Sequence, residues 1–433
     1  MIYNYKAILV YLVLIALATL IYLKFSILGL ITYLIVLILL EIVSELLINK
    51  LRERFQWLIT KKKDFLPKLD QEGLNKFFPH GFDSELGWVR KPNTEHDENG
   101  KFGKTAWHIN KIGSRSNPNH ETLPKLISCY GDSFAFSRQV NDNETWAHYL
   151  SKLTKTNVLN WAVGNHGIDQ SLIRLKREYP RNKTKIVLLG VVPDTVSRIM
   201  SAWKHFYEYG NTFAFKPRFK LENNQLTLIK NFIDTKEKYN DYEKYINEVI
   251  KEDFFYKYKF RKELIQFPYL ISILKNLRRN FPLIYFNTMS LIYEKLNKNP
   301  EKYKALAMQK IMRINKAWRL KLYRKKEVND LLIAIVKEFI SYSKQQNFIP
   351  IFLFLPQKDD VSYIKKHKHF YEHIKNELKN DIILINLAEE LIKVEDLDNL
   401  YSDNTEYGGH YSKFGNEFVA KTIYQKLKEE KLI

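Results

Sequence analysis

The stretch LISCYGDSF, residues 126–134, decides the fold, because a short apolar run ends there in a glycine and two small polar residues. The run 126–130 does not alternate with polar residues, as is typical of a parallel strand that is buried on both faces. Asp132 and Ser133 then follow the carboxyl end of that strand, where α/β proteins bind their ligands. The stretch therefore predicts an α/β domain with Ser133 at the ligand-binding edge of its sheet.

Similar runs recur along the chain and alternate with helical patterns. The apolar runs lie at 158–162, 186–192, 349–355 and 382–385, and the helical patterns at 145–153, 169–178, 328–345, 371–378 and 413–429. This βαβ rhythm predicts a three-layer, flavodoxin-like domain with a parallel sheet.

Two stretches interrupt or precede this rhythm. Residues 201–325 are rich in Lys, Tyr and Phe and predict one large, mainly helical insertion, which serves as a lid, as a partner surface or as a structural extension. Residues 56–120 are rich in Gly, Pro, Asn and His and predict a loop-rich entry segment with a few short strands. The predicted domains are thus a membrane segment 1–55, the entry segment 56–120 and an α/β domain 121–433 that contains the insertion.

The N-terminal segment predicts a transmembrane helical hairpin. Residues 7–23 are uncharged and almost wholly apolar, and a second apolar run occupies 27–40 and continues amphipathically. The first run gives about 25 Å of helix, close to the thickness of a bilayer core. A cleavable signal peptide is the competing interpretation, but only Lys6 precedes the run and no small-residue cleavage site follows it.

The charges that follow the hairpin bear on its orientation in the cell membrane. Lys50, Arg52, Arg54 and 61–63 come directly after the second run, and the positive-inside rule favours the cytoplasmic side for that end. With two spans, both termini then lie inside. If the second run instead lies flat in the interface, the large domain is exported.

The composition argues against nucleic acid, metal and cofactor. The net charge of +21 attracts polyanions in general. However, the lysines are scattered through the chain, and no zinc-finger spacing, RNA-binding aromatic motif or phosphate loop occurs. We expect a solvated basic surface and no nucleic-acid partner. No ligand spacing for a metal is present either, so we expect neither a metal nor another cofactor.

A histidine near the C-terminus is the candidate partner of Ser133. His410 lies in YGGHYS, residues 407–412, directly before the last helical pattern. A serine hydroxyl needs a base to take its proton, and imidazole has a suitable pKa for that task. The structural alternatives are that Asp132 or Ser133 only caps a helix and that His410 is an ordinary polar residue.

These blocks together resemble the SGNH, or GDSL-type, hydrolase family, in particular its membrane-anchored branch of polysaccharide O-acyl esterases and acyltransferases. The resemblance covers about residues 82–433 and rests on three motifs: GDSF at 131–134, NWAVGN at 160–165 and GHYS at 409–412. It implies that Ser133 is the nucleophile, that His410 is the base, and that Ser133, Gly164 and Asn165 form the oxyanion hole.

The chain departs from the family pattern at two places. Where the family has Gly, any residue, Asn and Asp, this chain has GVVPD at 190–194, so that the oxyanion asparagine is missing. The family's acid, three residues before the histidine, is replaced by Tyr407, which leaves Asp403 or Glu406 as candidates. A backbone carbonyl that orients His410 is the further alternative.

The resemblance implies a serine-dependent ester hydrolase or O-acyltransferase that forms an acyl-enzyme at Ser133. Its substrate would be a small-molecule ester, an acylated carbohydrate or a lipid-linked glycan, and its setting the membrane. The alternative is a non-catalytic membrane-anchored module that binds a partner or an anionic polymer. The sequence names no protein partner.

Overall fold

The structure is a computed structural model that describes residues 5–433, and the chain divides into two compact units. The first unit comprises the described part of Met1–Leu69 together with His205–Thr212 and Phe254–Ala317. The second unit comprises Asp70–Lys204, Phe213–Asp253 and Trp318–Ile433. Residues of the predicted insertion 201–325 therefore contribute to both units.

A five-stranded parallel sheet forms the centre of the second unit, in the order β11-β10-β7-β5-β6. Numbered along the chain, this is the order 2-1-3-4-5 of flavodoxin-like folds, so the predicted fold class is confirmed. The strands are buried because their apolar runs face helices on both sides. Their bounds are β5 Lys125–Gly131, β6 Asn157–Asn160, β7 Ile186–Val191, β10 Ile349–Phe354 and β11 Ile383–Asn386.

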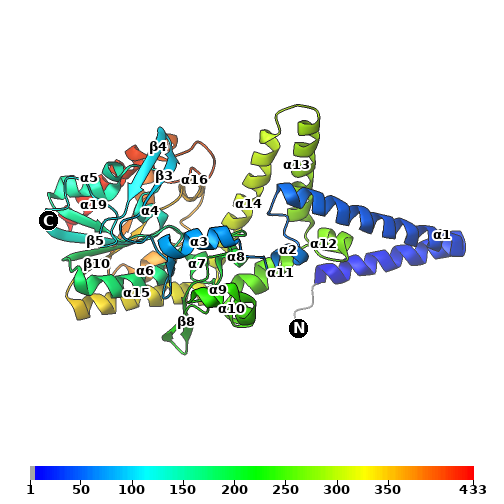
Figure 1. The fold of residues 1–433 in the computed structure, drawn as a ribbon, viewed down its shortest axis with the longest axis horizontal. Helices are drawn as coiled ribbons and strands as arrows, with labels where there is room; N and C mark the ends of the chain where they lie inside the picture. Colours follow the sequence, from blue (N-terminus) through cyan, green and yellow to red (C-terminus); the bar gives the residue numbers. More distant parts are fainter. Residues whose placement is uncertain (1–4) are drawn as a thin grey trace. The chain divides into compact units, whose positions relative to one another are not determined.

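Helices cover both faces of this sheet (Figure 1). α5 (Trp146–Thr154) and α19 (Lys413–Glu429) pack together on one face, and α6 (Ile168–Glu178) and α15 (Lys326–Gln346) cover the other. α19 buries Val419, Ile423 and Leu427, which share one helix face because they are spaced four apart. The result is the predicted three-layer arrangement.

The second unit also contains three antiparallel hairpins. They pair β1 (Phe82–Asp83) with β2 (Gly87–Trp88), β3 (Glu95–Gly100) with β4 (Gly103–His108), and β8 (Arg218–Glu222) with β9 (Gln225–Ile229). The last hairpin lies inside the insertion, for which no strong strand was expected. Its turn is formed by Asn223 and Asn224, both with positive φ, which is the geometry of a tight two-residue hairpin turn.

The remaining helices are shorter connections or belong to the first unit. Their bounds are α3 Gln71–His80, α4 Ser133–Phe136, α7 Thr195–Arg198, α8 Lys204–Tyr207, α9 Lys236–Asn240, α10 Ile246–Glu252, α14 Glu301–Leu322, α16 Lys358–Lys366, α17 Glu372–Leu378 and α18 Ala388–Leu391. Single turns of 3-10 or π geometry occupy Asp142–Glu144, Tyr179–Arg181, Tyr242–Tyr245, Tyr256–Phe260 and Asp398–Leu400.

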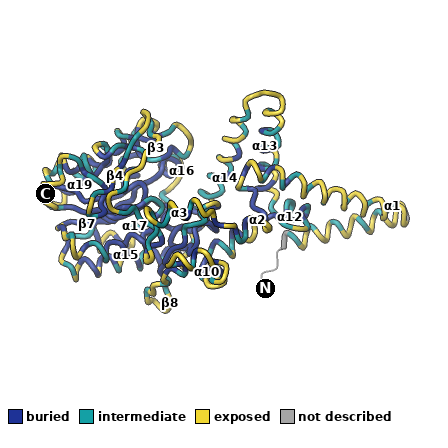
Figure 2. The backbone as a smooth tube through the Cα atoms, in the orientation of Figure 1, coloured by how far each residue is buried: buried dark blue, intermediate teal, exposed yellow. Residues whose placement is uncertain are grey.

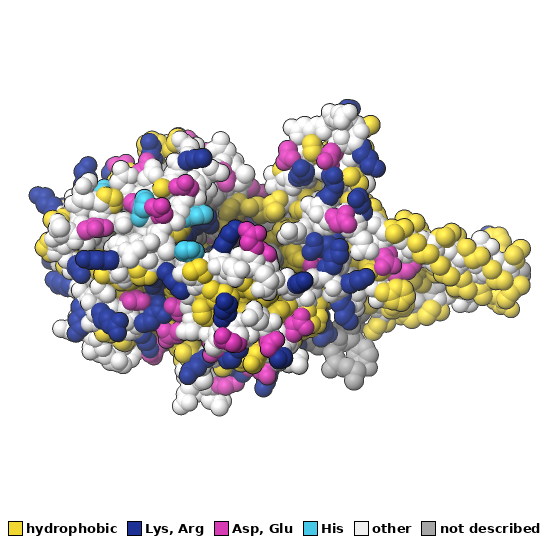
Figure 3. Space-filling model, viewed as in Figure 1, with side chains coloured by type: hydrophobic (Ala, Val, Ile, Leu, Met, Phe, Trp, Pro, Cys, Tyr) yellow, Lys and Arg dark blue, Asp and Glu magenta, His cyan; other side chains and the backbone are white. Residues whose placement is uncertain are grey.

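The N-terminal helix α1 (Tyr5–Arg54) turns back on itself. The Tyr33 hydroxyl donates to the carbonyl of Leu14 at 3.1 Å, although in a straight helix these residues would lie about 28 Å apart. Its two arms, Ala7–Phe25 and Ile27–Arg54, are each long and apolar enough to cross a membrane. Their residues are largely exposed (Figure 2) and their side chains are mostly hydrophobic (Figure 3), which agrees with the predicted hairpin.

Short helices pack around the end of this hairpin within the first unit, namely α2 Lys61–Asp64, α11 Arg261–Glu263, α12 Tyr269–Lys275 and α13 Leu277–Lys295. Glu41 of α1 accepts hydrogen bonds from the backbone N–H groups of Tyr269 and Leu270, which are orphan donors at the start of α12. Ile48, Leu51 and Leu58 are buried against these helices.

Candidate active site

Ser133 lies in the turn between β5 and α4, at the carboxyl edge of the sheet. β5 ends at Gly131, where a Cβ would lie 2.0 Å from the carbonyl oxygen of Gly190 in the neighbouring strand, so only glycine allows this approach. Asp132 then caps α4, because its carboxylate accepts the backbone N–H of Phe134 at 2.9 Å. Ser133 is 5% exposed, and its hydroxyl forms no hydrogen bond with any residue that the structure describes.

The carboxylate of Asp132 also joins this turn to the end of β7. It accepts the backbone N–H of Val192 at 2.8 Å and pairs with Arg198 Nη1 at 3.2 Å. Burial raises the pKa of Asp132, and the guanidinium of Arg198 acts in the opposite direction. Asp132 therefore serves as the helix cap, which leaves the Ser133 hydroxyl available for other chemistry.

His410 lies in the loop before α19, against the residue that follows Ser133. Its ring packs on the ring of Phe134 with centroids 4.9 Å apart. Its Nδ1 is 2.7 Å from Oε1 of Gln139, a hydrogen bond that spans 271 residues of sequence. The fold thus brings the predicted base to the nucleophile turn and provides it with a side-chain partner.

The hydrogen bonds of Gln139 identify the tautomer of His410. Gln139 Oε1 also accepts the backbone N–H of His410 at 3.1 Å and the hydroxyl of Ser402 at 2.9 Å, and Gln139 Nε2 donates to the carbonyl of Asn99 at 3.1 Å. A backbone N–H can only donate, so the atom facing His410 is the amide oxygen. Nδ1 must then carry the proton, and Nε2 keeps the lone pair that a base needs.

Burial keeps this imidazole neutral. Burial lowers the pKa of His410 to about 3, and the nearby cation of Arg138 acts in the same direction, whereas the carboxylate of Glu98 opposes it. His410 is therefore in the basic form at neutral pH.

Neither of the two carboxylates predicted as the acid is bonded to His410 among the described residues. Asp403 accepts from the backbone N–H and the hydroxyl of Thr405, and Glu406 is exposed. The position next to Nδ1 belongs to the neutral amide of Gln139. Glu98 is a buried carboxylate that is connected to His410 through Gln139, because it accepts the backbone N–H of Gln139 at 3.0 Å.

The residues predicted for the oxyanion hole lie partly together. A Cβ on Gly164 would lie 3.9 Å from the Cβ of Ser133, and the carbonyl of Gly164 is held by the Trp88 indole N–H at 3.0 Å. The backbone N–H groups of Ser133 and Gly164 have no acceptor among the described residues. Asn165 has a φ of 67°, and its side chain is hydrogen-bonded to no described residue.

The segment that lacks the family's asparagine makes other contacts. The N–H of Val192 is used by Asp132, and Asp194 accepts the hydroxyl of Ser197 at 3.2 Å and pairs with Arg198 at 3.7 Å. The segment 190–194 therefore organises the loop after β7. It brings no amide side chain to Ser133.

Three residues near this site were not predicted from the sequence, namely Gln139, Glu98 and Arg90. Gln139 follows α4 in the left-handed conformation, with a φ of 66°. Glu98 lies on β3, and Arg90 follows β2, so both come from the segment expected to be mostly loop. No family motif includes these positions, and their approach to Ser133 depends on tertiary folding.

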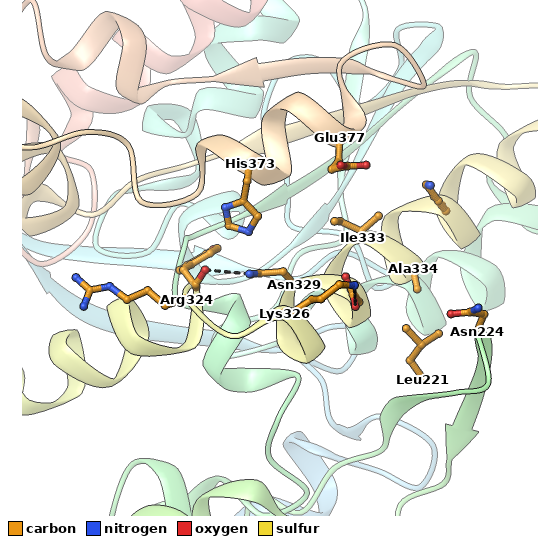
Figure 4. Close-up of a pocket in the computed structure, with 12 residues that line it drawn as sticks. Leu221, Asn224, Arg324, Lys326, Asn329, Ile333, Ala334, His373 and Glu377 are labelled. Atoms are coloured by element: carbon orange, nitrogen blue, oxygen red, sulfur yellow. Dashed lines mark hydrogen bonds and ion pairs between the residues drawn. The ribbon is translucent and has the colours of Figure 1, made fainter.

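A separate hollow on the second unit has a volume of about 740 Å³ and contains neither Ser133 nor His410 (Figure 4). His373 and Glu377 of α17 line it opposite Lys326 and Asn329 of α15. Asn329 donates to the carbonyl of Tyr323 at 2.9 Å. Across the described residues, no group of three or more His, Cys, Asp or Glu side chains is arranged to hold a metal ion.

Comparisons with known proteins find similar proteins among solved structures only. No family model and no curated protein matches the chain. Solved structures do. A putative lipolytic protein of the G-D-S-L family from Desulfitobacterium hafniense DCB-2 is 13% identical, with 70% of this chain and 99% of that chain covered and a TM-score of 0.33.

Two other structures are similar to the same extent. The lipase/acylhydrolase from Enterococcus faecalis is 10% identical, with 71% and 96% of the chains covered and a TM-score of 0.32. The acetyl xylan esterase AlAXEase is 10% identical, with 69% and 98% covered and a TM-score of 0.32. The solved neighbours are consistently GDSL-type proteins and esterases.

Proposed function

We propose that this protein is a membrane-anchored, serine-dependent ester hydrolase or O-acyltransferase. Ser133 Oγ attacks the ester carbonyl while His410 Nε2 takes its proton, and the N–H groups of Ser133 and Gly164 receive the oxyanion. Collapse of the tetrahedral intermediate expels the alkoxide, which takes the proton from His410 and leaves an acyl group on Ser133. Water or a hydroxyl of an acceptor then removes that acyl group with the same base.

The observation that carries the proposal is the hydrogen bond between His410 Nδ1 and Gln139 Oε1, at 2.7 Å. It holds the imidazole against the nucleophile turn in the tautomer that has a free Nε2. The backbone N–H groups of Ser133 and Gly164, which have no acceptor among the described residues, are available to an oxyanion and support the same assignment.

The substrate class that we assign is an acylated carbohydrate or a lipid-linked glycan. The resemblance to the membrane-anchored branch of the SGNH family supports an O-acyl ester, and the two apolar arms of α1 support work at a bilayer. Basic residues lie at the end of the second arm, at Lys50, Arg52 and Arg54, and beyond it at 61–63, and this positive charge favours the cytoplasmic side for the second unit.

A serine-directed fluorophosphonate probe tests the enzyme function. Full-length protein in detergent should be labelled, and the Ser133→Ala variant should not, because the probe phosphonylates only an activated serine. Ser137→Ala is the matched control, since Ser137 is buried and lies four residues further along the same turn. Equal labelling of the wild type and the Ser133→Ala variant would leave a non-catalytic binding module as the better description.

Hydrolysis and transfer are separated by the fate of the acyl group. The acyl-enzyme formed from p-nitrophenyl acetate is followed by mass spectrometry with and without a soluble oligosaccharide. Decay in buffer alone at the rate of p-nitrophenol release identifies a hydrolase. Decay that requires the sugar, with an acetylated sugar as product, identifies a transferase.

A further inference from the structure

Arg90 is a buried cation beside the proposed active site whose hydrogen-bond donors are unused. Its guanidinium carbon lies 3.7 Å from the ring centre of Trp107 and 4.3 Å from that of Phe136. Its side chain is 18% exposed, and Nε is fully buried. Stacking between aromatic rings holds a guanidinium in place without consuming its N–H groups.

None of these N–H groups donates a hydrogen bond to a residue that the structure describes. Glu98 is the nearest charge partner, but its Oε1 is 4.0 Å from Arg90 Nη2, too far for a hydrogen bond. Neighbouring arginines are different. Arg138 Nε donates to Glu98 at 2.9 Å, and Arg115 donates to Asp142 and to three backbone carbonyls.

Arg90 lies near the nucleophile, within reach of the same point beside Gly164. Arg90 Nη2 lies 3.7 Å from the position that a Cβ on Gly164 would occupy, and Ser133 Cβ lies 3.9 Å from the same point. Arg90 and Ser133 therefore both lie beside Gly164, whose backbone N–H has no acceptor among the described residues. The site also lacks a side-chain oxyanion donor, because 190–194 contains no asparagine.

We propose that Arg90 replaces the missing asparagine by donating a hydrogen bond to the oxyanion formed on Ser133. The inference rests on the proposed function. When the Ser133 Oγ bond to the acyl carbon forms, the π electrons move to the carbonyl oxygen and the serine proton moves to His410. Arg90 keeps its own proton throughout and stabilises the negative oxygen by charge and hydrogen bonding. When the carbonyl re-forms, the alkoxide leaves with the proton from His410.

Turnover of the neutral ester p-nitrophenyl acetate by full-length protein in detergent tests this role. Arg90→Gln should lower kcat by about 100-fold or more, with KM changed only slightly, since an oxyanion donor acts in the transition state. Arg90→Lys keeps the charge but lacks the planar guanidinium, so its kcat should lie between those of the wild type and Arg90→Gln. Guanidinium ion added to Arg90→Ala should restore at least part of kcat by entering the space between the two rings.

Arg174→Gln is the matched control. Arg174 is 3% exposed and lies over the ring of Trp161, but it already donates to the carbonyl of Gly113 at 2.9 Å. We expect it to lower thermal stability at least as much as Arg90→Gln and to leave kcat of the folded protein unchanged. Circular dichroism of each variant establishes the folded fraction.

The outcomes distinguish this inference from the function on which it rests. If Ser133-dependent turnover persists in Arg90→Gln at the wild-type kcat, Arg90 is no oxyanion donor while the enzyme function stands. A defect limited to KM for an anionic ester such as p-nitrophenyl hemisuccinate would assign Arg90 to substrate charge recognition instead. If the wild type has no turnover that Ser133→Ala abolishes, the proposed function fails, and the inference fails with it.

Discussion

The turn that carries Ser133 and the loop that carries His410 are held by different chemistry. The nucleophile turn is fixed by a buried charge pair, in which Asp132 joins the cap of α4 to Val192 and Arg198. The histidine is held by a neutral amide, because Gln139 occupies the place next to Nδ1. Both arrangements fix a geometry, but only the first does so with full charges.

This difference separates orientation from charge stabilisation. An amide oxygen fixes the tautomer of His410 as well as a carboxylate does, yet it offers less stabilisation to the imidazolium of the proposed acyl transfer. Removing the buried charge should therefore cost mainly folding stability. Changing the amide should alter mainly the pH dependence and rate of catalysis.

The largest expected effect is on stability, for Asp132→Ala. The change leaves Arg198 buried without its main partner and removes the cap of α4, and breaking a buried pair in this way typically costs about 3–5 kcal/mol. For a unit of this size the loss corresponds to a decrease in Tm of roughly 10 °C. Differential scanning fluorimetry of full-length protein in detergent measures it.

The double variant Asp132→Ala with Arg198→Met sharpens this result. It removes the buried cation that Asp132 no longer balances, and it should recover part of the lost Tm if the charge pair is what holds the turn. A double variant no more stable than Asp132→Ala alone would attribute the loss to the helix cap. Arg198 also donates to the carbonyl of His166 at 2.9 Å, so recovery should be incomplete.

Gln139→Glu should move the acid limb of the pH profile. In the wild type the pKa of His410 is about 3, so the base stays unprotonated and kcat/KM should be flat from about pH 8 to pH 5. A carboxylate at position 139 favours the protonated imidazole and raises that pKa. The variant should therefore lose activity as the pH falls through about 6. Hydrolysis of p-nitrophenyl acetate across this range measures the shift.

Gln139→Leu is the control that removes the acceptor without adding charge. We expect kcat to fall by about 100-fold, because the imidazole loses its fixed orientation. The pH at which activity is lost should be lower in Gln139→Leu than in Gln139→Glu. If both variants kept the wild-type profile, His410 would act independently of Gln139.

Burial of His410 also couples its protonation to folding. Its pKa is lower in the folded chain than the value of about 6.5 of a free histidine, so the unfolded chain binds the proton more tightly. The contribution of this group to stability is complete above about pH 6.5 and is lost as the pH falls toward 3. Activity assays at low pH therefore need a parallel measurement of folding.

Local patterns predicted the sheet because each strand is specified by its own apolar run. The runs at 126–130 and 186–192 contain few alternating polar residues, and burial on both faces follows from that composition. The hairpin of β8 and β9 was missed because its strands are short and half exposed within a mainly helical region. Its signal was the Asn223 and Asn224 turn.

The sequence predicted only those residues of the candidate site that lie within a recognisable short motif. Ser133, Gly164 and His410 each belong to a short block of sequence, and the fold brings these blocks together. The partner of His410 could not be read in this way. Gln139 meets it across 271 residues, and an isolated glutamine in a loop has no pattern that marks it. Nor does the sequence around Arg90 indicate that aromatic rings hold it beside Gly164.

The smallest expected effect concerns the two carboxylates near His410. If Gln139 orients the imidazole, Asp403→Asn and Glu406→Gln should each change kcat by less than about threefold, since neither carboxylate is bonded to His410. Asp403 accepts from Thr405, so its amide should loosen that turn slightly and lower Tm by a small amount. Turnover of p-nitrophenyl acetate at pH 7 is the measurement. A loss of 100-fold or more in either variant would mean that the loop 403–409 rearranges with substrate, bringing a carboxylate to Nδ1 in place of the amide.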